Sequence, residues 1–225
     1  MKKSNLFLTI LGILTCSMMV FTNFNLVEAY KEIDLSDPFK NYLSLDKQPY
    51  SVLKLSGTNG YPIEVKYADE NGLKVLRSRT EHLKHSIQAD TLFIEFTGAR
   101  ITKQQSQFSK APAAIIIQRN TLPEIIAEDI HCRIADFEGS KMNLRIHGQA
   151  LAEIKDCHLN HMQVDISEQG HLEFFHQNSI DSLQLNMANT SVAFLKNVNL
   201  RHIQQDLSDS VSIVLSNHVF SALVE

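Results

Sequence analysis

The chain has 225 residues, of which 44% are hydrophobic and 20% charged, and its net charge is −4 with histidine counted as neutral. This length is enough for one sizeable globular domain. An acidic chain does not favour a nucleic-acid partner, and the sequence has no basic amphipathic helix of the kind that lies on membranes. Phosphate-loop, dinucleotide-binding, nucleophile-elbow and Cys-x-x-Cys motifs are absent from the sequence, so we expect no nucleotide, no small-molecule cofactor and no thiol-redox site.

The N-terminus has the composition of an export signal. Two lysines at the start precede an apolar run over 6–21, and Val27 and Ala29 are small residues at the two positions that a signal peptidase reads. We therefore predict a signal peptide over residues 1–29 that is cleaved after Ala29. The mature chain would then have a net charge of −5.

Two alternatives would keep this segment on the protein. The apolar run is short for a membrane span, which needs about 20 apolar residues, but it could remain as an uncleaved anchor. Cys16 could carry a lipid; however, Leu14 lies one position away from the place of the leucine in a lipobox, so lipidation is not expected. Each alternative exports the chain to the periplasm, the cell surface or the medium, with membrane contact only through this segment.

Residues 30–50 are polar and weakly periodic and contain Pro38 and Pro49, so we interpret them as a spacer. Strand-like alternation of apolar and polar residues begins at Ser51. It is broken by turn clusters and by a polar stretch over 98–112 that we interpret as a surface loop. We predict an irregular β segment from Ser51 to about Leu122.

The last hundred residues repeat every 20 to 21 positions. One column of apolar triplets reads Met142-Leu144-Ile146, Met162-Val164-Ile166, Leu183-Leu185-Met187, and then Ile203 with Leu207. A second column reads Ile134, Ile154, Phe174 and Phe194, in which the two phenylalanines are expected to stack inside the core. Within each block apolar and polar residues alternate, which is the period of a strand and not of a helix.

Short repeated strands cannot bury their apolar faces alone, so the copies must stack. The repeat therefore predicts an all-β fold, a single-domain β-solenoid with coils of 20–21 residues, over the domain 51–225. The competing fold is a leucine-rich repeat. Its pattern is partly met from Ile180 to Leu185, but the asparagine expected at position 188 is alanine, and no helical spacing follows.

Cys132 and Cys157 remain after signal cleavage, and a pair of cysteines in an exported chain suggests a disulfide. The repeat argues against it, because residues that stack are 20 or 21 apart and these are 25 apart. Cys132 is expected to lie beside Ala152 or Glu153.

The layout of 51–225 resembles the head GIN domain family, the auto-transporter adhesin head domain. The resemblance rests on Val52-Leu53-Lys54-Leu55-Ser56-Gly57, Pro62-Ile63-Glu64-Val65-Lys66-Tyr67, Leu73-Lys74-Val75 and Thr91-Leu92-Phe93-Ile94-Glu95-Phe96, followed by the coils. It implies an exported β-solenoid with an adhesion role and no catalytic residues. Many corners here carry His, Asn, Gln or Asp in place of the family's small Gly and Ser corners.

The ten histidines do not predict a metal site. Zinc needs three or four ligands around one point, whereas the repeat places Ser182 between His161 and His202, and places His158 beside Ser179. No column holds two adjacent histidines, so we expect no bound metal.

Outward carboxylates provide the one enzymatic alternative. Polysaccharide lyases and hydrolases use clustered acids on an outer face, and Glu153, Asp156 and Glu173 are the candidates here. The turns are short and form no evident cleft, so we expect no catalytic residues. The sequence favours an exported, non-catalytic surface module that presents a rigid face to a glycan or a protein, with a purely structural envelope role as a further possibility.

Overall fold

The computed structural model describes residues 3–31, 37–45, 49–57, 62–97, 112–139 and 141–216. The chain divides into two compact units, Met1–Asn41 and Tyr42–Glu225. We call the second one the β unit. The expected loop over 98–112 lies almost wholly outside the described residues.

The described part of the first unit forms one helix, α1 (Lys3–Lys31). Its segment Phe7–Glu28 has a mean hydropathy of 1.8, and this segment is long and apolar enough to cross a membrane, which a signal sequence near the N-terminus can also be. The apolar stretch is thus longer than the run that the sequence suggested. The helix supports the prediction of export, and it continues through the expected cleavage position at Ala29.

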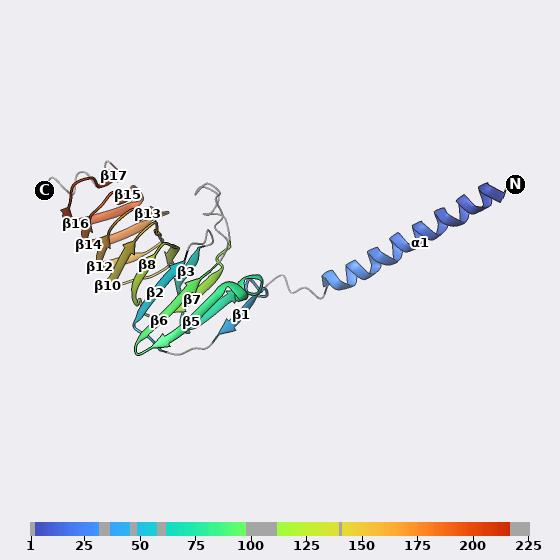
Figure 1. Cartoon of the computed structure of the whole chain (residues 1–225), viewed down its shortest axis with the longest axis horizontal. Helices are drawn as coiled ribbons and strands as arrows, with labels where there is room; N and C mark the ends of the chain where they lie inside the picture. The colour runs from blue at the N-terminus through green and yellow to red at the C-terminus, as the bar shows by residue number, and fades with distance from the viewer. Residues whose placement is uncertain are drawn as a thin grey trace. The chain divides into compact units, whose positions relative to one another are not determined.

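The described residues of the β unit form two sheets and a short 3-10 helix, η1 (Arg77–His82) (Figure 1). Sheet A has nine strands, in the spatial order β1 (Tyr42–Leu45), β4 (Gly72–Leu76), β7 (Ile115–Arg119), β3 (Ile63–Tyr67), β9 (His131–Ala135), β11 (Leu151–Lys155), β13 (His171–Phe175), β15 (Val192–Leu195) and β17 (Ser212–Leu215). Sheet B has eight, in the order β16 (Val198–Leu207), β14 (Asn178–Met187), β12 (His158–Ile166), β10 (Lys141–His147), β8 (Glu124–Glu128), β2 (Val52–Gly57), β6 (Thr91–Phe96) and β5 (Leu83–Gln88). The all-β prediction is confirmed for the β unit.

From β8 to β17 the chain alternates between the two sheets, and each strand pairs in parallel with the strand two elements later. Met142 pairs with Met162, and Met162 with Leu183, as the apolar column predicted. The described part of the repeat contains strands and turns without helices, so the leucine-rich alternative is not supported. A step of 20 or 21 residues therefore corresponds to one pair of strands.

The second predicted column is wrong at its last step. Ile134, Ile154 and Phe174 follow one another in register, but Phe194 pairs with Glu173 and lies half-buried on the outer face. Its ring stacks on His171, with the ring centroids 4.9 Å apart. Phe174 does lie in the core, with 1% of its surface exposed. The expected stack of two phenylalanines is therefore absent.

The opening segment is more regular than the sequence suggested. β2 and β3 lie within the same two sheets, and each has a parallel neighbour on both sides: β6 and β8 flank β2, while β7 and β9 flank β3. Beyond them the sheets end in antiparallel strands, with β1 against β4 and β5 against β6. β1 lies inside the segment 30–50 that the sequence marks as a spacer.

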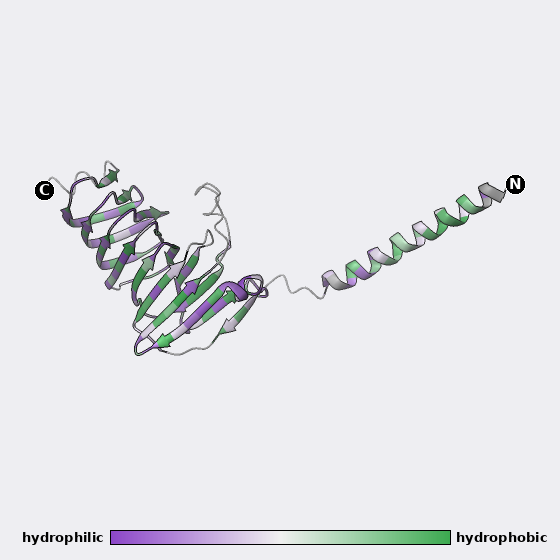
Figure 2. Cartoon of the chain, in the orientation of Figure 1, coloured by the Kyte–Doolittle hydropathy of each residue, from purple (hydrophilic) through white to green (hydrophobic). Residues whose placement is uncertain are grey.

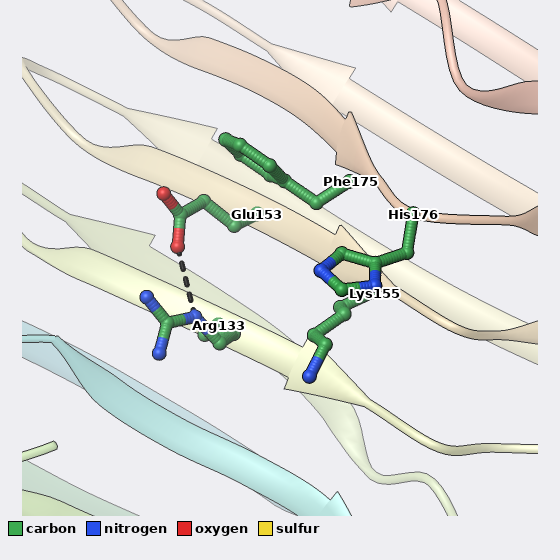
Figure 3. Close-up of a pocket in the computed structure, with 5 residues that line it drawn as sticks. All are labelled: Arg133, Glu153, Lys155, Phe175 and His176. Atoms are coloured by element: carbon green, nitrogen blue, oxygen red, sulfur yellow. Dashed lines mark hydrogen bonds and ion pairs between the residues drawn. The ribbon is translucent and has the colours of Figure 1, made fainter. Parts of the chain in front are cut away.

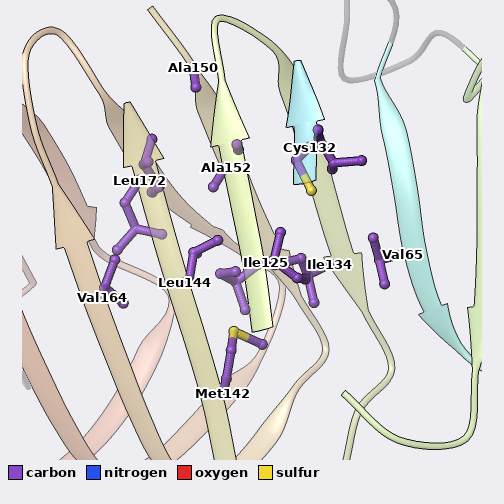
Figure 4. Packing of buried hydrophobic residues seen from close by; sticks show 14 of the residues in the cluster. Val65, Ile125, Cys132, Ile134, Met142, Leu144, Ala150, Ala152, Val164 and Leu172 are labelled. Atoms are coloured by element: carbon purple, nitrogen blue, oxygen red, sulfur yellow. The ribbon is translucent and has the colours of Figure 1, made fainter. Parts of the chain in front are cut away.

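A single apolar core fills the space between the sheets (Figure 4). Sheet A contributes residues such as Val65 and Ile134, and sheet B residues such as Leu144 and Val164, all 0–1% exposed. Hydrophilic and hydrophobic residues alternate along the strands, which leaves the outer faces polar (Figure 2). The β unit thus carries its own core.

Candidate functional site

Five side chains from three neighbouring strands and one corner surround a shallow hollow on the outer face of sheet A (Figure 3). Register explains why they meet: Glu153 pairs with Arg133 on β9 and with Glu173 on β13, and Lys155 pairs with Phe175. His176 follows β13 directly. The hollow residues, as we call them, are Arg133, Glu153, Lys155, Phe175 and His176.

Glu153 is the buried centre of this arrangement, with 4% of its surface exposed. Its Oε2 accepts a hydrogen bond of 3.0 Å from Nε of Arg133 and lies 2.9 Å from Nε2 of His131. Nη1 of Arg133 lies 3.6 Å from Oε2 of Glu64. The carboxylate is therefore held by two basic side chains of β9, as a buried acid must be.

The two neighbouring glutamates have opposite pKa shifts. Burial alone would raise the pKa of Glu153, but hydrogen bonds and charges from His131 and Arg133 outweigh it, and this pKa lies below the ordinary value. For Glu173, burial and then the negative charge of Glu153 raise the pKa above the ordinary value. Glu153 is thus the stable anion of the pair, and Glu173 binds a proton more readily.

The rim is aromatic and charged. Phe175 and Lys155 are half-buried, and His176 is exposed. Oδ2 of Asp156 lies 3.8 Å from Nζ of Lys155 and 3.7 Å from Nδ1 of His176, so one corner carboxylate connects two rim residues. His176 has a φ of +59°, which points its backbone out of the strand direction at the end of β13.

The three predicted acids do not form an exposed cluster. Glu153 and Glu173 are neighbours in register, as expected, and both face away from the core. Although Glu153 points outward as predicted, it is almost fully buried, because Arg133 and His131 of the adjacent strand cover it. Asp156 lies at the corner after β11 and contacts Lys155 and His176. Of the two glutamates, Glu173 is therefore the more accessible.

The histidines lie where the repeat placed them. His161 pairs with Ser182, which pairs with His202, and His158 pairs with Ser179. Within the described ranges, no three His, Cys, Asp or Glu side chains are grouped so that they could hold a metal ion. The sequence did not single out His131, although it is the histidine at the centre of the charged cluster.

Both cysteines of the β unit are buried and free. Cys132 pairs with Ala152, as predicted. Burial raises the pKa of the Cys132 thiol to about 12 and that of Cys157 to about 11. These thiols are therefore packing residues and not nucleophiles.

The outer face of sheet B is a second ordered surface, which is mostly polar apart from the half-buried Phe93 and Ile126. One column consists of amides, Asn143, Gln163, Gln184 and Gln204, paired in this order. The next column reads Arg145, Asp165, Asn186 and Asp206. Nδ2 of Asn186 donates to Asp165 over 2.6 Å, and Arg145 instead contacts Glu124 at 2.9 Å. This face has an aromatic ring, Phe93, beside Lys54, but among its described residues it has no buried charge such as Glu153 on sheet A.

Neither a known family model nor a curated protein matches the sequence. Among solved structures, a proposed adhesin from Bacteroides fragilis NCTC 9343 is 12% identical, with a TM-score of 0.47, over 75% of this chain and 77% of that chain. A proposed lipid-binding protein from Parabacteroides distasonis ATCC 8503 is 13% identical, with a TM-score of 0.39, over 78% of this chain and 93% of that chain. A proposed adhesin from Parabacteroides merdae ATCC 43184 is 13% identical, with a TM-score of 0.35, over 78% and 95%. Structural similarity with TM-scores below 0.5 does not indicate the function of this chain.

Proposed function

We propose that this chain is an exported, non-catalytic binding module, a β-solenoid of the kind found in the head GIN domain family, and that its hollow on sheet A binds a glycan. The alternation of parallel strands between two sheets with a step of 20–21 residues supports the solenoid. The N-terminal helix supports export to the periplasm or the cell surface.

One observation carries the binding function: Glu153, the acid at the base of the hollow, is already paired with basic side chains of the neighbouring strand β9. Oε2 of Glu153 contacts both Arg133 and His131, and the side chain is almost fully buried. A general acid or nucleophile must reach the bond that it cleaves, and Glu153 cannot. Its role is to fix Arg133 in the floor of the hollow.

The rim supplies the chemistry that a sugar ring needs. Phe175 offers an aromatic face for the apolar side of a ring, while Lys155 and His176 offer donors for hydroxyl groups. Parallel strands on both sides hold these groups at fixed spacing, which suits an extended ligand. A glycan is therefore favoured over a protein partner, which would need a contact surface of about 800 Å² on each side, larger than a hollow formed by five side chains.

The enzymatic alternative has one specific observation in its favour. Two adjacent carboxyl groups with pKa values shifted in opposite directions are the arrangement used for acid and base catalysis, and Glu153 and Glu173 have such shifts. The burial of Glu153 argues against it. If the alternative were correct, Glu173 would act as the proton donor, and Glu173→Gln would abolish turnover while leaving binding intact.

The test is a glycan array with residues 30–225, followed by affinity measurement on the strongest ligand. We expect Phe175→Ala and Lys155→Ala to weaken binding at least tenfold, since each removes a direct contact worth about 1.4 kcal/mol or more. Lys141→Ala on sheet B is the matched control and should change nothing. Equal affinity for all four proteins would remove the hollow as the binding site.

A further inference from the structure

Basic residues gather at one end of the β unit. The segment 72–88, which runs from β4 through η1 to β5, contains four lysines and arginines and one glutamate, in a chain whose net charge is −4. Arg77 and Lys84 are exposed, and Arg79 lies between them on η1. We call Arg77, Arg79 and Lys84 the end-cap patch. It is a positively charged surface on an acidic molecule.

The order of the strands explains why these residues share one end. β1 and β4 are the first two strands of sheet A, β5 is the edge strand of sheet B, and η1 connects one sheet to the other. The patch therefore lies across the end of the stack. Lys84 lies 3.7 Å from Glu95, but both side chains are largely exposed, so this pair holds the lysine only weakly.

The connection to α1 enters the β unit at the same end. Tyr42, the first residue of the unit, pairs with Leu76, which directly precedes Arg77. Between Lys31, the last residue of α1, and Tyr42 the chain can extend at most about 40 Å. While α1 is held in a membrane during export, this linker limits how far Tyr42 can be from the lipid. The adjacent Leu43 is 37% exposed and adds an apolar side chain to this end.

We propose that the end-cap patch is a docking surface for the headgroups of anionic phospholipids. Each lysine or arginine near an anionic membrane strengthens binding about fivefold, and this effect falls off within a Debye length of about 10 Å at 0.1 M salt. Docking directs this end of the β unit towards the membrane and leaves the rest of its outer surface open to solvent. The sequence predicts membrane contact only through the N-terminal segment, because basic residues spread over a strand, a 3-10 turn and another strand have no helical periodicity.

The test uses residues 32–225, because the β unit contains its own core and does not need α1 to fold. Flotation with vesicles compares neutral phosphatidylcholine with a mixture containing about 30% phosphatidylglycerol, at low and high salt. We expect binding to the anionic vesicles only, and its release as salt rises. Arg77→Gln and Lys84→Gln should each lower the partition coefficient about fivefold, and the double variant about 25-fold.

Two exposed basic residues elsewhere on sheet B, Lys141 and Arg201, provide the controls. Lys141→Gln and Arg201→Gln remove the same charge, and both should leave the partition coefficient unchanged. All four variants change exposed side chains, and an unchanged thermal midpoint will show that each is folded. Equal binding to neutral vesicles, an equal loss in the controls, or full competition by inorganic phosphate at constant ionic strength would overturn the proposal.

Discussion

At the scale of single residues, Glu153 shows that an outward position on a strand is not the same as an exposed one. Alternation correctly places it on the face of sheet A that points away from the core. Two basic side chains of the neighbouring strand, Arg133 and His131, then cover it. A spacing of 20 between Arg133 and Glu153, which carry opposite charges, was the signal in the sequence that could have predicted this pair.

Replacing Glu153 by glutamine should destabilise the β unit. The substitution leaves Glu64 as a countercharge for the half-buried Arg133 and removes the charged acceptor of a nearly buried hydrogen-bonded ion pair, which costs about 1–3 kcal/mol. Urea unfolding at neutral pH measures the loss. Glu173→Gln is the matched control: its ionised form is disfavoured in the folded chain, so this variant should be equally stable or slightly more stable. Equal losses in both variants would contradict the account.

The same cluster predicts how stability depends on pH. The pKa of Glu153 is lower in the folded chain than the unfolded value of about 4.3, so its contribution is complete above that value and is lost as the pH falls through the folded pKa. We expect the free energy of unfolding of the wild type to fall on acidification below about pH 4.3. In Glu153→Gln that fall should be smaller. Parallel pH profiles for the two proteins would show that Glu153 does not contribute.

Phe174 and Phe194 should respond very differently to substitution. Phe174 is in the core, so Phe174→Ala should cost about 3–5 kcal/mol, and Phe174→Asp should prevent folding. Phe194 is half-buried beside His171, so Phe194→Ala should cost about 1 kcal/mol. Chemical unfolding of the two alanine variants is the measurement. Losses of similar size would indicate that Phe194 is also a core residue, stacked on Phe174 as the 20-residue column predicts, and would contradict the structure.

At the scale of elements, the failure of that ladder has an identifiable cause. Lys155 pairs with Phe175 at a step of 20, but His158 pairs with Ser179 at a step of 21. The extra residue therefore lies in the corner between β13 and β14. There, Asn178 accepts a hydrogen bond from the Cys157 amide and donates to the carbonyl of Phe175.

A step of 21 must continue along the chain until another corner changes it. The column from Met162 to Leu183 already shows that step in the sequence. Extending it to the next strand pairs Phe194 with Glu173, as the structure does. This part of the register is therefore predictable from the sequence, because one extra residue at a corner shifts the following strands of both sheets.

The arrangement of the opening strands was not predictable in the same way. Alternation identifies β2, β3 and β6 as strands, but it does not tell which strands lie beside them. β2 lies between β6 and β8, which begin about 40 and 70 residues later in the chain. Neighbours at such distances are determined by packing of the whole unit, and no local pattern in the sequence encodes them.

Two corner glycines should separate backbone strain from local contacts. Gly139 and Gly148 have nearly the same φ, +65° and +66°, which disfavours any other residue. A Cβ at Gly139 would meet no atom, whereas one at Gly148 would collide with the carboxylate of Asp129, which accepts a hydrogen bond from the Gln149 amide. Gly139→Ala should cost about 1–2 kcal/mol, and Gly148→Ala about 1 kcal/mol more. Equal unfolding midpoints for Gly139→Ala and Gly148→Ala would contradict the close contact between Gly148 and Asp129.

At the scale of the whole molecule, the two ends of the β unit differ. One end is closed by the antiparallel strands β1, β4 and β5. At the other end, the last described strand of sheet B places Gln205 in the apolar column beside Leu185. An apolar residue in this position would favour pairing of the sheet edge with another chain, and a polar residue makes such pairing less favourable.

Export is the prediction that applies to the complete chain. We expect fractionation to find the protein outside the cytoplasm, with a cytoplasmic enzyme as the control marker. Intact mass then distinguishes the fates of the N-terminus: cleavage after Ala29 gives a chain that begins at Tyr30, whereas acylation would add a lipid at Cys16. A full-length, unmodified chain in the soluble cytoplasmic fraction would contradict the role proposed for α1.

The central claim is that the hollow on sheet A binds without catalysis, and one measurement tests it most directly. Residues 30–225 are incubated with each glycan that binds on the array, and the bound fraction and the released sugars are quantified in the same sample by mass spectrometry. We predict saturable binding that is lost in Phe175→Ala, with the glycan recovered intact. Release of reducing or unsaturated sugars that stops in Glu173→Gln would contradict the claim and would identify Glu173 as a catalytic residue.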